Sequence, residues 1–286
     1  MIGLRLIRSS RLLIILLIVP NAWAESQNVK YELAFTPFLP VRTMMQNYQP
    51  MRTYLEARLQ EPVTFVTAPD YKAYNQRLHQ HEYPFVITAA NSAYLAYAED
   101  GYVPMLRPII PTRPVLVVAV HSKLKNIKEL RGATLVLPDS LSVVAMQGVH
   151  MLSEAGLRPG SDIKIKYTAN HAAAVNYVVS GESLAAIVSD RALLQMPKIT
   201  REAVRVLHTW DAGAVPGIVY LAAPHVPQAR VDRLRKAILE YVRDNAAGRE
   251  LMKSLGYDGL VAATSEDIKP LAPYGAQLKA AMDAAP

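Results

Sequence analysis

The sequence predicts an α/β protein of two lobes, each a mostly parallel sheet flanked by helices, with two crossing strands between them. Strand-like and helix-like segments alternate at short intervals, which is typical of parallel sheets covered by helices. The alternation stops over residues 103–120, where four prolines punctuate two strand-like runs that have no helix between them. It then resumes and gives way to helices near the end of the chain. This interruption indicates a crossing from one lobe to the other.

The elements before the crossing follow from the spacing of apolar residues. Alternating apolar and polar side chains predict strands, and apolar residues three or four positions apart predict helices. Met44, Met51 and Leu55, for example, share one face of an expected helix. We expect strands over 30–37, 63–67 and 84–88 and helices over 41–59, 71–79 and 91–99, the last of them capped by Asn91.

The elements after the crossing follow the same rules. A strand over 133–137 leads through a short turn into a helix, which Gly156 ends. The other expected segments are a short helix or turn over 122–130, strands over 163–167, 184–188, 204–208 and 217–222, helices over 172–180, 228–246 and 249–255, and a helical tail. The crossings fall near 112–118 and 206–216, which gives a first lobe at 25–112 and 207–286 and an inserted second lobe at 113–206.

The first residues predict the compartment. Three arginines precede a short apolar run over 12–19, and Ala22-Trp23-Ala24 has the small-x-small form of a cleavage site. This is the pattern of a secretory signal peptide over 1–24, with cleavage expected after Ala24. The apolar run is too short for a comfortable membrane span. We therefore expect an exported protein of the periplasm, and a monomer.

Composition excludes several functional classes. The chain has no cysteine, so no disulfide framework, lipid anchor on cysteine or thiol nucleophile is expected. The leader contributes three arginines and no acidic residue, so the mature chain carries a net charge of +4 instead of +7. Lysine and arginine are scattered and form no run, which argues against nucleic acid and is compatible with small anionic ligands.

The turn after the strand at 133–137 predicts a binding site. Ser140 and Ser142 stand where the following helix begins, so hydroxyl groups and free backbone N–H groups converge there. The positive end of the helix dipole lies at the same place. Such a helix start suits a small anion, although a serine there often acts only as a helix cap. We expect Ser140→Ala to weaken binding at least tenfold, about 1.4 kcal/mol or more.

Five motifs give the chain a family resemblance. They are a Tyr-Leu helix-to-strand join over 54–63, the pair Asp70-Tyr71, a tyrosine at the start of a helix (Tyr94), the serine turn over 138–143, and Asn170-His171 ahead of a helix that ends in Gly181-Glu182. With these motifs the mature chain resembles the phosphonate- and phosphate-type substrate-binding proteins of ABC importers, in the two-lobed periplasmic binding protein group.

The resemblance implies a small oxyanion (phosphonate, phosphite or phosphate) held between the lobes and delivered to an ABC permease in the inner membrane. Leu141 and Val143 depart from the family turn, since they replace a hydroxyl donor and a glycine. Arg191 falls near the place of an acidic residue in family members that bind aminoalkyl ligands, and there it would favour an anion over an amine. The expected ligand-binding residues are Tyr71, Tyr94, Ser140, Ser142, His171, Asn91 and Arg191.

Two other binding functions stay open. A module of the same fold could report its ligand to a membrane histidine kinase, and a receptor could take a sulfonate or an organic acid instead. Enzyme chemistry is not expected, because no serine comes with an evident base and no glycine-rich phosphate loop is present. His79 and His81 have no partner at metal-ligand spacing, so neither a metal nor a cofactor is expected.

Overall fold

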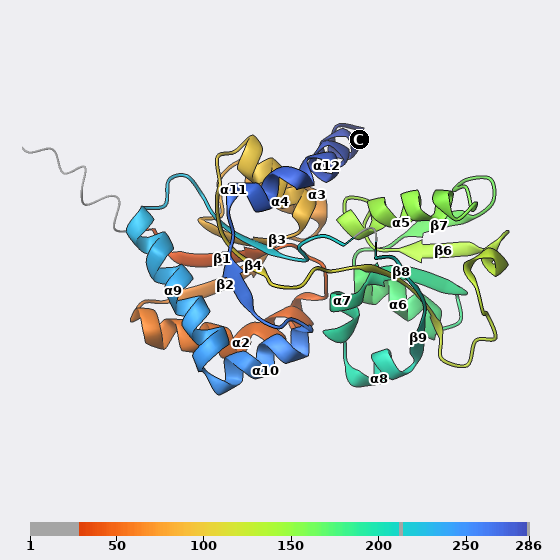
Figure 1. Cartoon of the computed structure of the whole chain (residues 1–286), viewed down its shortest axis with the longest axis horizontal. Coiled ribbons are helices and arrows are strands. Elements are labelled where there is room, and N and C mark those ends of the chain that lie inside the picture. Colours follow the sequence, from red (N-terminus) through yellow and green to blue (C-terminus); the bar gives the residue numbers. More distant parts are fainter. Residues whose placement is uncertain (1–28, 212–213, 285–286) are drawn as a thin grey trace, which may run out of the picture.

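The computed structural model describes residues 29–211 and 214–284, and these residues form two lobes side by side along the long axis of the molecule (Figure 1). The signal peptide expected over 1–24 lies outside the described residues. Within the described part of the chain, no helix combines the length and apolar character needed to cross a membrane.

The first lobe is built on a six-stranded mixed sheet, in the order β11-β4-β10-β3-β1-β2. Its strands β1, β2 and β3 run parallel, whereas β10 pairs antiparallel with both β3 and β4. The strands are β1 (Tyr31–Phe35), β2 (Val63–Thr67), β3 (Phe85–Thr88), β4 (Val103–Pro108), β10 (Val219–Ala222) and β11 (Leu260–Ala262). Because β10 and β11 come from the last third of the sequence, this sheet joins the two ends of the described chain.

The second lobe has a five-stranded mixed sheet, in the order β7-β6-β8-β5-β9. Strand β6 pairs parallel with β7 and β8, and β5 pairs antiparallel with β8 and β9. The strands are β5 (Pro114–Ala119), β6 (Thr134–Leu137), β7 (Lys164–Tyr167), β8 (Ala185–Ser189) and β9 (Val204–Thr209). All the strands of this sheet therefore lie between the two segments that cross from lobe to lobe.

Helices cover both sheets and bury apolar stripes against them. Helix α2 buries Met44, Tyr48 and Leu55 on the face that its apolar spacing predicts. Each lobe has its own apolar core. The helices of the first lobe are α2 (Val41–Leu59), α3 (Tyr71–His79), α4 (Ala90–Ala98), α9 (Gln228–Asp244), α10 (Ala246–Leu255), α11 (Ser265–Ile268) and α12 (Ala272–Ala284); those of the second are α5 (Val143–Glu154), α6 (His171–Val179), α7 (Asp190–Leu194) and α8 (Lys198–Glu202).

The spacing of apolar residues predicted the first and last residues of several elements correctly. The expected segments 41–59, 63–67 and 71–79 coincide with α2, β2 and α3. The prediction for Asn91 was wrong, because α4 begins at Ala90 and its cap is Ala89. Asn91 lies inside the first turn, where its side chain is free to reach another element.

Two segments link the lobes and pair with each other. Thr112 and Val215 form an antiparallel bridge, with N···O distances of 2.8 and 3.1 Å. Beside it, Arg113 Nε lies 2.8 Å from a carboxylate oxygen of Asp211. The two segments therefore form a paired crossing between the sheets of the two lobes.

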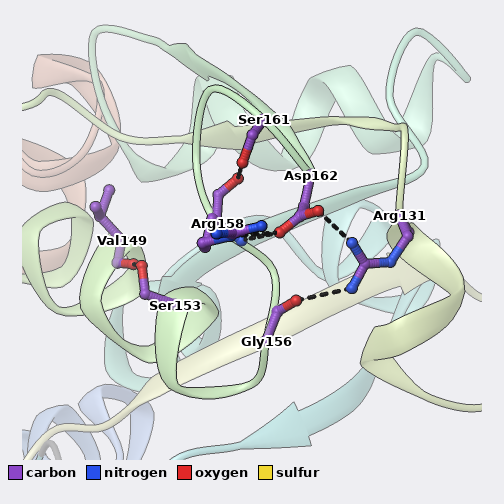
Figure 2. A network of polar contacts seen from close by, with 7 residues as sticks. All are labelled: Arg131, Val149, Ser153, Gly156, Arg158, Ser161 and Asp162. Atoms are coloured by element: carbon purple, nitrogen blue, oxygen red, sulfur yellow. Dashed lines mark hydrogen bonds and ion pairs between the residues drawn. The ribbon is translucent and has the colours of Figure 1, made fainter.

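A polar network holds the far end of the second lobe (Figure 2). Asp162 accepts hydrogen bonds from Arg131 and from Arg158, whose Nε lies 3.2 Å from the carboxylate. Arg131 also donates to the carbonyl of Gly156 at 2.9 Å. Hydrogen bonds from Arg158 and the charge of Arg131 hold the pKa of Asp162 below its ordinary value. The network fixes the loop between α5 and β7, far from the contact between the lobes.

Candidate functional site

A cavity lies between the lobes, at the carboxyl ends of parallel strands from both sheets. Its volume is about 40 Å³, enough for about three water-sized groups. Open α/β sheets place their ligands at this end of the strands. The polar residues that line it are Thr36, Tyr71, Thr112, Ser142, His171, Ser189, Arg191, Gln195 and Tyr257.

The lobes touch on several sides of this cavity. Asn91 Nδ2 in the first lobe donates to the carbonyl of Leu141 in the second at 2.9 Å. The backbone N–H of His171 donates to the carbonyl of Phe38 at 3.2 Å, and Asn47 Nδ2 to that of Gln195, also at 3.2 Å. The cavity is thus enclosed by contacts that would break if the lobes separated.

The start of α5 faces the cavity with unused donors. Ser142 is the N-terminal cap by position, but its side chain accepts no capping hydrogen bond. Ser142, Val143 and Val144 all line the cavity. The first N–H groups of a helix have no partner within the helix, and the helix dipole adds positive potential there. This end of α5 can therefore hold an anionic oxygen.

Tyr71 comes from the opposite lobe and meets Ser142. It is the first residue of α3, which Asp70 caps by accepting from the N–H of Ala73 at 2.7 Å. The Tyr71 side chain is buried and lines the cavity together with Ser142. Burial, with a smaller contribution from the charge of Asp139, raises the pKa of Tyr71 well above its ordinary value. The phenol therefore stays protonated and can donate to a ligand.

His171 is a neutral donor. It begins α6, is 3 % exposed, and its Nδ1 accepts from the backbone N–H of Ser189 at 3.2 Å. An accepting Nδ1 leaves the proton on Nε2. Burial lowers the pKa of His171 to about 3. Burial disfavours the charged ring, so His171 donates to a ligand as the neutral imidazole.

Arg191 supplies the positive charge of the cavity. Its side chain is 15 % exposed, and its guanidinium carbon lies 5.6 Å from the centre of the Tyr257 ring. Its Nε makes no hydrogen bond within the described chain, and its Nη2 lies 3.4 Å from the carbonyl of Pro111. Asp190 Oδ2 forms an ion pair with Arg191 Nε at 3.7 Å, and Asp190 Oδ1 accepts the backbone N–H groups of Arg113 and Arg191 at 3.0 and 2.7 Å. Arg191 thus keeps hydrogen-bonding capacity for an anion.

The described lining of the cavity carries a positive charge and no negative one. Among the described residues that line it, Arg191 is the one permanent cation, and no aspartate or glutamate is present. A buried positive charge without a lining carboxylate favours an anion and disfavours an amine. No group of three or more His, Asp or Glu residues in the described chain could hold a metal ion.

The structure brings together Tyr71, Ser142, His171 and Arg191 from the expected set, and it places the other three outside the lining. Ser140 is exposed, because Asp139 accepts the N–H of Leu141 and turns the chain at this point. Tyr94 packs on α12, and Asn91 reaches Leu141 instead of the cavity.

The sequence analysis did not predict the remaining polar residues of the cavity lining. Thr36 and Ser189 could have been found as polar residues at the ends of strands, where parallel sheets form their sites. Thr112 and Tyr257 carry no local signal, because they belong to the crossing and to the segment after α10. The fold brings them together, with Thr112 Oγ1 and the Tyr257 hydroxyl 3.3 Å apart.

Gly217 makes this part of the wall possible. A Cβ at this position would overlap Thr112 Oγ1 and the Tyr257 hydroxyl. We expect Gly217→Ala to push these side chains apart and to cost about 1–3 kcal/mol of stability, the usual range for overpacking. Urea unfolding would measure the loss. An unchanged midpoint would show that the wall yields without strain.

The comparisons with known proteins agree with this geometry. A family model described as "ABC transporter, phosphonate, periplasmic substrate-binding protein" matches residues 33–268. No curated protein sequence matches the chain.

Solved structures share the fold at low sequence identity. The methylphosphonate complex of PhnD1 from Prochlorococcus marinus superposes with a TM-score of 0.73 at 14% identity, covering 87% of this chain and 97% of that one. A binding protein component of an ABC phosphonate transporter from Pseudomonas aeruginosa gives 0.74 at 13%, with 88% of each chain covered. The periplasmic aliphatic sulphonate binding protein SsuA from Escherichia coli gives 0.59 at 16%, with 88% and 87% covered.

Proposed function

Because the chain belongs to the periplasmic substrate-binding proteins of phosphonate ABC transporters, we propose that it captures a compact phosphorus oxyanion, of the phosphonate, phosphite or phosphate class, between its two lobes. Proteins of this family bind a small ligand for import and are not enzymes. In this proposal the chain is exported through a signal peptide cleaved after Ala24 and passes its ligand to a permease in the inner membrane.

One observation carries the choice of ligand: the cavity combines a buried guanidinium with a free helix start and has no carboxylate in its described lining. Arg191 would pair with one anionic oxygen from one side. Ser142 and the first N–H groups of α5 would hold another, and Tyr71 and the Nε2 proton of His171 would donate to the rest. Hydrogen bonds to a charged group contribute about 1.5–3 kcal/mol each.

The size of the cavity supports a compact ligand. A volume of about 40 Å³ favours a compact ligand over a long organic acid. An aminoalkyl group would place an ammonium in a cavity that has Arg191 and no carboxylate in its described lining. We therefore expect aminoalkylphosphonates to bind more weakly than methylphosphonate or phosphite.

The serines of the turn give a matched pair of variants. We expect Ser142→Ala to weaken oxyanion binding about tenfold, because one hydrogen bond to a charged oxygen is lost. Ser140 is exposed and lies outside the cavity lining, so Ser140→Ala is now expected to bind like the wild type, in place of the tenfold loss expected from the sequence. Calorimetric titration of both variants would measure the difference. Equal affinities would remove Ser142 from the site.

A thermal-shift screen of residues 25–286 tests the proposed ligand class. The panel contains phosphate, phosphite, methylphosphonate, an aminoalkylphosphonate, an alkanesulfonate and small carboxylates. A ligand at 100 times its dissociation constant adds about 2.7 kcal/mol of stability. A shift with phosphorus oxyanions supports the proposal, whereas a shift confined to sulfonates or carboxylates assigns the site to one of those classes. A gene for a sensor kinase, instead of a permease and ATPase, beside this one would favour a sensing role.

A further inference from the structure

The last helix of the described chain lies across the junction of the lobes. Helix α12 follows the last residue that the family model matches, residue 268. It packs on α4 of its own lobe and also contacts α5 of the second lobe. Figure 1 shows it over α4, with the chain end directed toward the second lobe. A helix that contacts both lobes can influence whether they stay together.

The inner face of α12 contributes apolar contacts to both lobes. Leu278 is fully buried in a cluster with Tyr71 and Leu141, and Met146 of α5 packs against the same cluster. Tyr71 belongs to the first lobe, whereas Leu141 and Met146 belong to the second. Tyr274, one turn earlier on α12, packs against the cores of both lobes. Separation of the lobes would expose the part of this surface that faces the second lobe.

Close packing fixes α12 to the first lobe. Gly275 lies against Tyr94 so closely that a Cβ would overlap the ring. Lys279 forms an ion pair at 2.8 Å with Glu99, the residue that follows α4. Tyr94 was expected from the sequence to face the ligand. In the structure it packs against Gly275 of α12 instead. The helix moves with the first lobe, and its contacts with Leu141 and Met146 exist only while the lobes are together.

We propose that α12 is a strap that stabilises the closed arrangement of the lobes, with Leu278 as a positioning residue that sets how long the ligand stays bound. The inference rests on the proposed binding function. A protein that binds its ligand only when closed has an apparent dissociation constant equal to the intrinsic one divided by the closed fraction. Contacts that raise this fraction strengthen binding without touching the ligand. Leu278 is not among the lining residues of the cavity.

Three substitutions test the strap. Leu278→Ala removes the buried contact, and Gly275→Ala pushes α12 away from Tyr94. Gln277→Ala, on the exposed face of the same helix, is the control. With methylphosphonate as the probe, we expect the first two to weaken binding about tenfold, equivalent to about 1.4 kcal/mol, through faster dissociation. In the ligand-free chain, small-angle X-ray scattering should give a larger radius of gyration for both, and an unchanged one for the control.

A double-mutant cycle separates the strap from a general loss of stability. Met146→Ala removes a side chain of the second lobe that packs against the cluster around Leu278, so the double variant with Leu278→Ala should lose little more affinity than either single variant. Fully additive losses, or variants that stay folded with unchanged affinity and radius, would overturn the strap. If the wild type binds no methylphosphonate, the proposed ligand fails, and the radius of gyration still decides whether α12 holds the lobes together.

Discussion

Arg191→Met is expected to weaken oxyanion binding about 100-fold, or ~2.7 kcal/mol, near the upper end for a hydrogen bond to a charged group. The guanidinium is the one permanent cation in the described lining of the cavity, and its Nε makes no hydrogen bond there and only a 3.7 Å ion pair with Asp190. Methionine keeps a flexible apolar chain against Tyr257 and Gly256 while removing the charge. Calorimetric titration of wild type and variant would measure the change.

Two further variants sharpen this test. Arg191→Lys keeps the charge but loses the planar fork of donors, so its affinity should lie between those of wild type and Arg191→Met. Arg205→Met is the matched control, because Arg205 lies in the same lobe and donates to the carbonyl of Ser122 at 3.0 Å, outside the cavity lining. If the Arg191 and Arg205 variants lost affinity equally, Arg191 would not be the anion partner.

His171 should make the protein less stable in mild acid. Burial lowers the pKa of His171 to about 3 from the ordinary 6.5. Between these values the unfolded chain binds a proton that the folded chain does not, so stability is full above pH 6.5 and falls as the pH drops toward 3. At pH 5 the loss is about 2 kcal/mol, from ~1.5 pH units at 1.36 kcal/mol per unit.

Urea unfolding at pH 7 and pH 5 measures this loss. His171→Gln keeps an oxygen that can accept from the N–H of Ser189 but cannot take up a proton in this range. The variant should therefore lose about 2 kcal/mol less than the wild type between the two pH values. Equal losses in the two proteins would assign the acid sensitivity to other groups.

The fold could be predicted from sequence because its signals are local. Helix α2 follows from apolar spacing, and α3 begins where Asp70 offers a capping side chain. The division into lobes follows from the prolines of the first crossing. Apolar spacing, capping residues and prolines each involve residues that are close together in the sequence, so they can be recognised without the structure.

The site could be predicted only in part, because a binding site depends on distant segments. Ser142 was expected from the strand, turn and helix around it, and Tyr71 and His171 were expected from the family resemblance; all three line the cavity. Tyr94 also stands near a strand end, but α12, about 180 residues later, covers it. Spacing within α4 could not reveal that contact.

The charge state of His171 could not be predicted from the sequence either, because it also depends on distant segments. Its neutral form follows from complete burial, which requires both lobes and the hydrogen bond from Ser189. Tyr257 enters the lining through the packing of the C-terminal segment beside Thr112 and Gly217. Motifs indicate where a ligand lies, and the packing of distant segments decides which side chains meet it.

Calorimetric titration of methylphosphonate into residues 25–286 tests most directly whether this cavity captures a compact phosphorus oxyanion. We expect saturable one-to-one binding that competes with phosphite and is weakened about 100-fold by Arg191→Met. Absence of saturable binding, or equal binding by wild type and Arg191→Met, would contradict capture of such an anion at this site.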